Sequence, residues 1–251
     1  MIQVEIDGAV LRLTLNRPEK RNALDELTIS ELRAAVEGVS GNTDVRVVTI
    51  AGQGPDFCAG MDLTMMAASN NDGALEFLES AERLADLYRT LRHCPKPVLA
   101  AIQGRALGGG CGLAMACDAV LAAESAQFGF PEVNIGFVPA IVMALLRRSV
   151  GEKRAFDLLA SGAPVGARQA CDLGMITRVY PDADFDASVA AYGASLAAKS
   201  ASAVSLTKKL FYSIDNMSFE AALDAGTQVN AIARTTADAR HGFENFGKRK
   251  P

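Results

Sequence analysis

Histidine, tryptophan and paired cysteines are scarce in this 251-residue chain, and each shortage excludes a kind of site. The sequence has two histidines, His93 and His241, no tryptophan, and five scattered cysteines. Histidines so far apart exclude a multi-histidine metal centre and disfavour a histidine-based catalytic triad. No cysteines have C-x-x-C spacing, which argues against a structural zinc site and a disulfide framework. We therefore expect no metal site, and chemistry that does without the usual histidine base.

Excess positive charge and long apolar runs are lacking as well. The chain carries 25 basic and 29 acidic residues, so it lacks the basic excess that nucleic-acid binding requires. The longest apolar stretch, residues 135–146, contains Pro139 and is too short to span a bilayer. The N-terminus has no basic segment followed by an apolar run, and thus no visible secretory signal. These absences predict a cytoplasmic protein with neither nucleic acid nor membrane as partner.

Residues 104–112 (GRALGGGCG) suggest a nucleotide-binding loop but match none of the known fingerprints. The dinucleotide motif fails because Leu113 stands where its third glycine is needed, and no Gly-Lys-Ser/Thr is present to make a P-loop. The chain also lacks G-x-S-x-G, which excludes a serine nucleophile elbow. The glycines need another explanation.

The order of hydrophobic patterns predicts an α/β protein. A hydrophobic content of 49% allows a large core, and buried strands starting near residues 45 and 98 favour parallel βα units. The predicted strands span residues 10–15, 45–51, 98–103 and 119–123. A helix is predicted to follow the capping side chains of residues 22–25 and to continue to residues 38–41, and further helices are predicted at residues 73–92, 113–117, 185–200, 202–214 and 219–239. We predict a core at residues 1–184 and an α-helical region at residues 185–251, which serves as a subunit contact or as a plain helical cap.

Two segments of small residues follow buried strands and suit a use in catalysis. Glycines between a strand and the first turn of a helix let backbone N–H groups approach a ligand at the positive end of the helix dipole, which suits a developing oxyanion. The alternative for residues 104–112 is close packing of a helix on a sheet. Because residues 57–63 (FCAGMDL) also join a buried strand to a helix start, two donor sites could converge on one carbonyl oxygen.

Glu132 lies among apolar and small residues in the segment 128–139 (FGFPEVNIGFVP). Such surroundings raise the pKa of a carboxyl group and make it a candidate proton shuttle near neutrality. Since it follows Pro131, it could also be a simple acid at a helix start. Combined with two oxyanion-type turns, the catalytic interpretation is the better one.

Six segments spread over nearly the whole chain form a pattern. They are residues 16–24 (NRPEKRNAL), 57–63 (FCAGMDL), 96–104 (KPVLAAIQG), 106–118 (ALGGGCGLAMACD), 128–132 (FGFPE) and 246–251 (FGKRKP). In order and spacing they resemble the enoyl-CoA hydratase/isomerase (crotonase) superfamily. The resemblance implies a superhelix of repeated ββα units, with a C-terminal α-helical trimerisation region and trimers often paired into hexamers. It also implies a coenzyme A thioester as substrate and no permanently bound cofactor.

The resemblance assigns roles to residues at matching positions. The backbone N–H groups of Met61 and Gly109 would hold the thioester oxygen and stabilise an enolate. The implied contacts with coenzyme A and the substrate fall on Lys20, Arg21, Ala23, Ala59, Gly60, Asp62, Leu63, Gly108 and Gly112. Lys20 and Arg21 could equally be a solvated pair, and residues 70–73 are expected to help shape the acyl pocket.

One departure from the superfamily pattern leaves the reaction open. Members with two catalytic glutamates carry the first at the position of Gly112 and the second at that of Glu132. With Glu132 as sole acid/base, the enzyme could hydrate a 2-enoyl-CoA, fatty or branched, or move a double bond in Δ3–Δ2 isomerisation. We expect the nearby Cys111 to be a packing residue and Asp118 a structural turn acid. Hydration is favoured because most relatives of this type are hydratases, and a non-catalytic acyl-CoA-binding scaffold is the alternative of another class.

Overall fold

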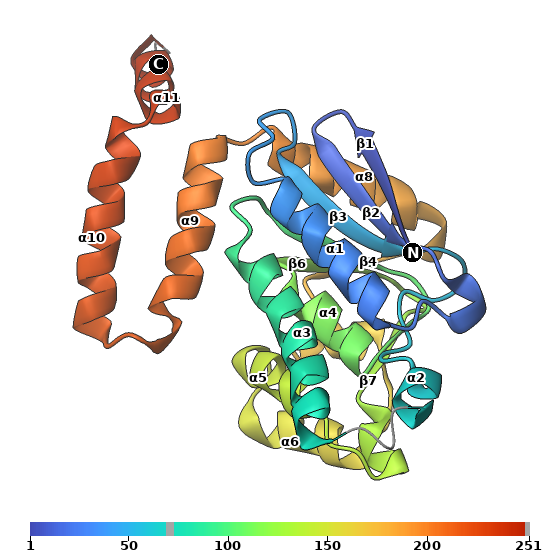
Figure 1. Cartoon of the computed structure of the whole chain (residues 1–251). Coiled ribbons are helices and arrows are strands. Elements are labelled where there is room, and N and C mark those ends of the chain that lie inside the picture. The colour runs from blue at the N-terminus through green and yellow to red at the C-terminus, as the bar shows by residue number, and fades with distance from the viewer. Residues whose placement is uncertain (69–72, 249–251) are drawn as a thin grey trace.

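The chain folds around a six-stranded sheet, as the computed structural model of residues 1–68 and 73–248 shows (Figure 1). The strand order is β1-β2-β3-β4-β6-β9, with β1 antiparallel to β2 and the other neighbouring pairs parallel. These strands are β1 (Ile2–Asp7), β2 (Val10–Leu15), β3 (Val47–Gly52), β4 (Val98–Ile102), β6 (Ala119–Ala123) and β9 (Arg178–Tyr180). A second, three-stranded sheet contains β5 (Arg105–Leu107), β7 (Gln127–Gly129) and β8 (Val165–Gly166).

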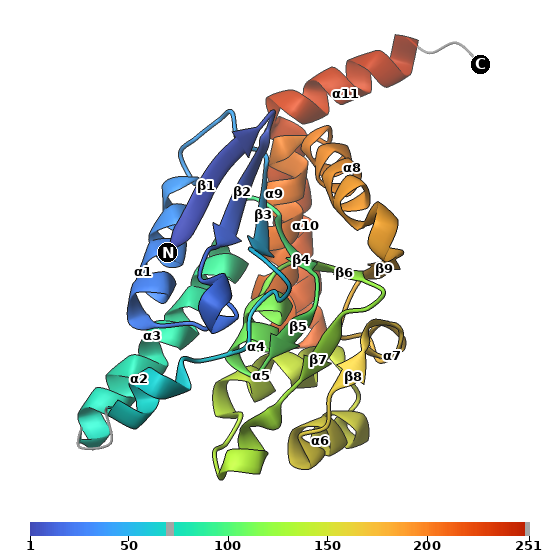
Figure 2. The same cartoon turned by 90° about the vertical axis from the view of Figure 1, so that its right-hand side faces the viewer.

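Helices cover both faces of the main sheet, which explains why its central strands are continuous apolar runs. Every residue of β3, β4 and β6 is buried. Helices α1 (Glu26–Gly38) and α3 (Ala74–His93) lie on one face (Figure 1). Helix α8 (Phe185–Ala197) covers the other face, where Phe185 and Val189 pack on the strands (Figure 2).

Units of two strands and a helix recur along the chain, as in β1-β2-α1, β4-β5-α4 and β6-β7-α5. The remaining helices of the described residues are α2 (Leu63–Ala68), α4 (Gly109–Ala116), α5 (Ala140–Ser149), α6 (Glu152–Ser161), α7 (Ala167–Asp172), α9 (Ala201–Ser213), α10 (Phe219–Thr235) and α11 (Ala237–Lys248). Short 3₁₀ helices are η1 (Pro18–Lys20), η2 (Pro131–Ile135), η3 (Asp182–Asp184) and η4 (Ile214–Asn216). The predicted α/β class and its ββα repeats are confirmed.

The helices after residue 185 fall into two sets. Helix α8 packs on the sheet, whereas α9, α10 and α11 project away from it (Figure 1). The prediction of a single helix at residues 219–239 is wrong, because the chain becomes extended at Thr236 and α10 ends there. Thr236 instead caps the next helix, α11, since its hydroxyl accepts a hydrogen bond from the Ala239 amide at 3.2 Å. Helix α10 buries none of its residues within the chain. Within the described ranges, no helix has both the length and the apolar composition needed to cross a bilayer.

A buried ion pair anchors α9 to the core. The Lys208 ammonium lies 2.7 Å from the Asp118 carboxylate, which also accepts from the Tyr212 hydroxyl at 2.8 Å. Lys208 donates to the Leu91 carbonyl at 2.8 Å as well. Asp118 is therefore a structural acid, as predicted, and it lies at the joint between the core and the projecting helices.

Candidate active site

Three chain segments are brought to one edge by the pairing of short parallel strands. The amide of Cys58 donates to the Arg105 carbonyl, and the Leu107 amide donates back to the Cys58 carbonyl, each at 3.0 Å. Strand β5 pairs in parallel with β7, and the Gly108 amide donates to the Gly129 carbonyl at 2.8 Å. Because neighbouring parallel strands end at the same edge, the residues that follow all three segments lie together. These residues carry the two predicted donors and Glu132.

The amides of Met61 and Gly109 meet at this edge. Gly60 has a positive φ of 102°, and a Cβ built on it would lie 3.0 Å from the Leu107 carbonyl oxygen and 3.6 Å from the Gly109 nitrogen. Only glycine permits this approach of the two backbones. Neither the Met61 amide nor the Gly109 amide donates to another of the described residues. Two unpaired N–H groups side by side are the arrangement that stabilises an oxyanion.

Helix α4 begins earlier than the sequence indicates. The predicted start at residue 113 is wrong, since α4 spans Gly109–Ala116 and buries all of its residues. Its N-cap, Gly108, has a positive φ of 50°, and a Cβ there would lie 2.8 Å from Glu132 Oε1. The glycines therefore serve both proposed purposes. They allow close packing around the first turn, and they leave the Gly109 amide at the helix N-terminus.

Glu132 lies in η2, directly beside that helix start. Burial raises the pKa of its carboxyl group above the ordinary value. Its Oε2 atom is buried and has no hydrogen-bond partner among the described residues. An unpaired buried carboxylate oxygen costs free energy, and groups with such perturbed surroundings cluster at functional sites. This carboxyl group is therefore a candidate to hold and release a proton.

Position 112 has no room for a second carboxylate. A Cβ on Gly112 would lie 2.5 Å from the Tyr88 hydroxyl and 2.5 Å from Val142 Cγ1. Cys111, next to it, is fully buried, and burial raises the pKa of its thiol well above the usual range, so it is an inert packing residue as predicted. Position 112 therefore supplies no second carboxylate to work beside Glu132.

Arg17 connects the loop at residues 17–25, which holds the first predicted coenzyme A contacts, to the turn that contains Met61 and Asp62. The Arg17 guanidinium contacts the Asp62 carboxylate at 3.0 Å, that of Asp25 at 3.1 Å and the Ala23 carbonyl at 2.7 Å. Although burial alone would raise it, hydrogen bonding from Arg17 and nearby amides lowers the pKa of Asp62. The Leu24 amide donates to the Gly60 carbonyl at 2.8 Å. Asp62 is engaged within the protein and acts on the site by holding this turn.

The other predicted contact residues surround this tie. Lys20 and Arg21 are exposed, Leu63 is exposed, Ala59 is partly exposed, and Ala23 is buried. The Ala59 amide donates to the Arg21 carbonyl at 3.0 Å, so the segments of the predicted coenzyme A path run side by side. Residues 70–72 of the predicted acyl-pocket segment lie outside the described residues.

The sequence reasoning missed two organisers of this loop, Arg17 and Asn22. Asn22 is buried with a positive φ of 55°, accepts from the Arg17 amide at 2.9 Å, and donates to the Gln53 and Asp56 carbonyls at 2.9 and 2.8 Å. We expected it to help cap α1, but the cap is Asp25, which accepts from the Thr28 amide at 2.8 Å. Asparagine tolerates left-handed backbone, and that was the one available signal.

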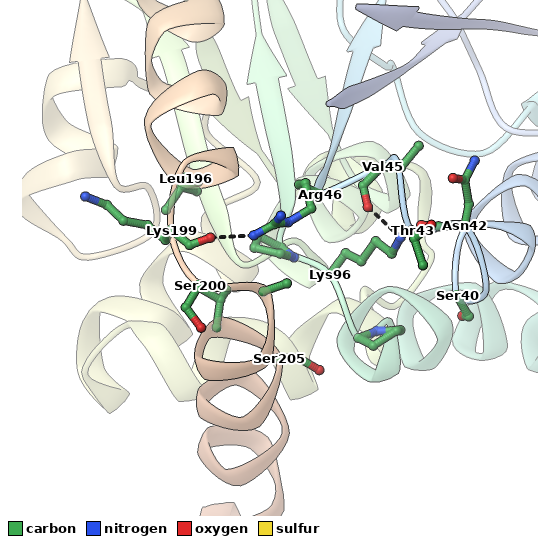
Figure 3. Close-up of a pocket in the computed structure, with 14 residues that line it drawn as sticks. Ser40, Asn42, Thr43, Val45, Arg46, Lys96, Leu196, Lys199, Ser200 and Ser205 are labelled. Atoms are coloured by element: carbon green, nitrogen blue, oxygen red, sulfur yellow. Dashed lines mark hydrogen bonds between the residues drawn. The ribbon is translucent and has the colours of Figure 1, made fainter. Parts of the chain in front are cut away.

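A pocket of about 310 Å³ lies away from this site, before the amino ends of β3 and β4 (Figure 3). Two of its three cationic side chains donate to backbone carbonyls, since Lys96 donates to Val45 and Arg46 donates to Lys199, both at 2.5 Å. The pocket is a junction between the sheet and the α8–α9 connection. Residues 1–68 and 73–248 contain no group of three His, Cys, Asp or Glu side chains suited to a metal ion.

The ββα core brings two backbone amides without described partners and the half-buried Glu132 to one edge, an arrangement that suits a substrate developing negative charge on an oxygen. Comparison with known proteins identifies the family. The profile of the enoyl-CoA hydratase/isomerase family matches residues 5–251. The chain therefore belongs to this family, whose substrates are coenzyme A thioesters, and the predicted membership of the crotonase superfamily is confirmed.

Individual relatives agree over the full length. The chain is 35% identical to the 2,3-dehydroadipyl-CoA hydratase of Escherichia coli K12, covering 96% of this chain and 94% of that protein. It is similar to the crystal structure of an enoyl-CoA hydratase of Mycobacterium smegmatis, with a TM-score of 0.95 and 32% identity over 100% of this chain and 97% of that one. It is also similar to the structure of an enoyl-CoA hydratase from Bacillus anthracis, with a TM-score of 0.92 and 28% identity over 100% of this chain and 97% of that one.

Proposed function

We propose that the protein hydrates a 2-enoyl-CoA with a fatty or branched acyl group. The thioester oxygen accepts hydrogen bonds from the Met61 and Gly109 amides, and these bonds strengthen as an enolate forms. Glu132 takes a proton from water as the hydroxyl adds to the β carbon, and then returns a proton to the α carbon. The product is a 3-hydroxyacyl-CoA, and Glu132 ends in its starting protonation state.

The observation that carries this proposal is the meeting of three groups at one edge. Two backbone amides without partners in the described chain lie beside the half-buried carboxyl group of Glu132, whose pKa is raised by burial. Removing one oxyanion donor costs about 10²–10³ in rate, and a positioned general acid/base contributes about 10²–10⁴. The hydratase names of the relatives at 28–35% identity favour addition of water over other uses of the same groups.

A second candidate, Δ3–Δ2 double-bond migration, is favoured by one observation. Tyr88 and Val142 occupy the space at position 112, so Glu132 has no second carboxylate to help orient water. Isomerisation needs only one base, which removes a proton from the α carbon and returns it to the γ carbon. In both reactions the enolate oxygen accepts hydrogen bonds from the Met61 and Gly109 amides.

The remaining features of the proposal concern binding and assembly. Lys20 and Arg21 are exposed where they can meet coenzyme A phosphates, and Ala23, Ala59 and Leu63 follow the same path. We also propose a homotrimer or hexamer, because α10 exposes Phe219, Leu223 and Ile232. The boundary at residues 184 and 185 and the cytoplasmic location stay predictions.

Mass spectrometry separates the two candidate reactions. Wild-type enzyme is supplied with 2-enoyl-CoA and 3-enoyl-CoA of matched chain length, over short, long and branched acyl groups. Hydration adds the mass of one water, whereas migration leaves the mass unchanged and is recognised by chromatographic separation of the 2-enoyl-CoA and 3-enoyl-CoA isomers before the mass is measured. We expect a water adduct of the 2-enoyl substrates. Migration of 3-enoyl substrates without any water adduct would reverse the assignment, and no turnover on the whole panel would refute both.

A further inference from the structure

The first turn of α4 is held from outside rather than by a cap of its own. Its N-cap, Gly108, makes no side-chain hydrogen bond, and Gly109 and Gly110 follow. Glycine has more backbone freedom than any other residue, so a turn built from glycines needs external contacts to keep one orientation. That orientation decides where the Gly109 amide points.

Cys58 and Tyr88 contact the first turn of α4 from two sides. On one side Gly110 packs so closely that a Cβ would lie 2.4 Å from the Cys58 carbonyl oxygen. On the other side Tyr88 of α3 donates from its hydroxyl to the Gly109 carbonyl, with an Oη–O distance of 2.6 Å. The Tyr88 side chain is 4% exposed, so this bond is shielded from water. A hydrogen bond in such surroundings is directional and strong.

The place of the Tyr88 hydroxyl depends on position 112. Its Oη lies 2.5 Å from where a Cβ of residue 112 would stand, so any side chain at that position would displace it. Burial raises the pKa of the Tyr88 phenol well above its usual value, and the charge of the nearby Glu132 raises it further. The hydroxyl therefore stays protonated and remains a donor over the working pH range.

We propose that Tyr88 is a positioning residue, which occupies the space of the absent side chain at position 112 and, through the Gly109 carbonyl, aims the Gly109 amide at the thioester oxygen. Its buried hydroxyl bonds to the backbone and does not touch the substrate. The proposal rests on the proposed function, because the aimed amide is one of the two thioester donors. It explains how a glycine-built turn without a cap presents a fixed donor.

The test combines kinetics with a direct probe of the thioester carbonyl. Tyr88→Phe removes the hydroxyl and keeps the ring. The acyl-CoA probe is the saturated counterpart, ¹³C-labelled at the carbonyl, of whichever 2-enoyl-CoA the wild type turns over best. Infrared difference spectra report how far the bound carbonyl is polarised. Tyr212→Phe is the matched control, since Tyr212 also donates from a partly buried hydroxyl to a structural acceptor, away from the paired amides.

In Tyr88→Phe we expect kcat to fall about two- to tenfold, the loss of one buried hydrogen bond, with KM within twofold of wild type. The carbonyl band of the bound thioester should move toward that of the free thioester. Tyr212→Phe should keep both the band and kcat. Wild-type kcat and band position in Tyr88→Phe, a change in KM alone, or equal effects in Tyr212→Phe would overturn the proposal. An inactive wild type would instead refute the proposed function.

Discussion

Alanine at position 112 should destabilise the protein, although alanine is ordinarily the better helix residue. In a helix interior with room for a methyl group, Gly→Ala adds about 0.5–1 kcal/mol of stability. At Gly112 the added Cβ would lie 2.5 Å from Tyr88 Oη and from Val142 Cγ1, about 0.9 Å short of the 3.4 Å at which ordinary contact begins. Overpacking of a close-packed core costs about 1–3 kcal/mol, which outweighs the gain in helix propensity.

Thermal unfolding of Gly112→Ala measures this balance. A net loss of about 1–2 kcal/mol corresponds to a Tm lowered by about 2–8 °C for a chain of this size. Gly193→Ala is the matched control, because Gly193 is also buried in a helix but its Cβ would meet Val10 at an ordinary 3.6 Å. The control should be neutral or stabilising.

A double-mutant cycle tests the cause of the loss. Val142→Ala removes one of the two clashing atoms, so Gly112→Ala should cost less in that background, with a coupling of about 0.5 kcal/mol or more. The same crowding predicts that Gly112→Glu does not install a working second carboxylate. A Gly112→Ala variant as stable as wild type, or a cycle without coupling, would refute the reasoning.

Four further predictions concern proton binding by Glu132, the core and assembly. Hydration should speed up as pH rises through the raised pKa of Glu132, since only the ionised carboxylate takes a proton from water, and a flat pH profile of kcat/KM would contradict this. Because folding raises the pKa of Glu132, this residue stabilises the folded state at low pH, and the stabilisation is lost as pH rises through the pKa of the folded state. In unfolding experiments the stability of Glu132→Gln relative to wild type should therefore increase with pH. Lys208→Met should lower the unfolding free energy by about 3–5 kcal/mol in denaturant titrations, because it leaves Asp118 without its cation. The control is Lys209→Met, which replaces an exposed neighbouring lysine and should change the unfolding free energy by no more than about 0.5 kcal/mol. Phe219, 73% exposed on α10, should hold the proposed trimer or hexamer together, so light scattering should give three or six chains for wild type and fewer for Phe219→Asp.

Hydrophobic patterning predicted the buried strands well because burial on both faces leaves a strong signal. It missed β1, an edge strand that stays largely exposed, with Val4 and Ile6 61% and 55% exposed although they pair with the buried Leu13 and Leu11. It also placed the start of α4 too late, since glycines are poor helix formers by themselves. Close packing against Cys58 and Tyr88 overrides that propensity.

The site was predictable where chemistry follows from local sequence. The two glycine turns and the apolar surroundings of Glu132 indicated donors and a shifted carboxyl group. The role of the Tyr88 hydroxyl could not be predicted, because Tyr88 fits the apolar stripe of α3 and its hydrogen bond to the Gly109 carbonyl depends on how α3 and α4 pack. The tie between Arg17 and Asp62 likewise joins segments far apart in sequence, and no local pattern predicts it.

The most direct test of the account compares hydration of a 2-enoyl-CoA by wild type and by Glu132→Gln at neutral pH. The substitution keeps the shape of the side chain and removes its ability to accept a proton. We predict that wild type hydrates the substrate, and that Glu132→Gln lowers kcat by about 10²–10⁴ while it still binds the thioester. Hydration by Glu132→Gln within tenfold of the wild-type rate would contradict the account.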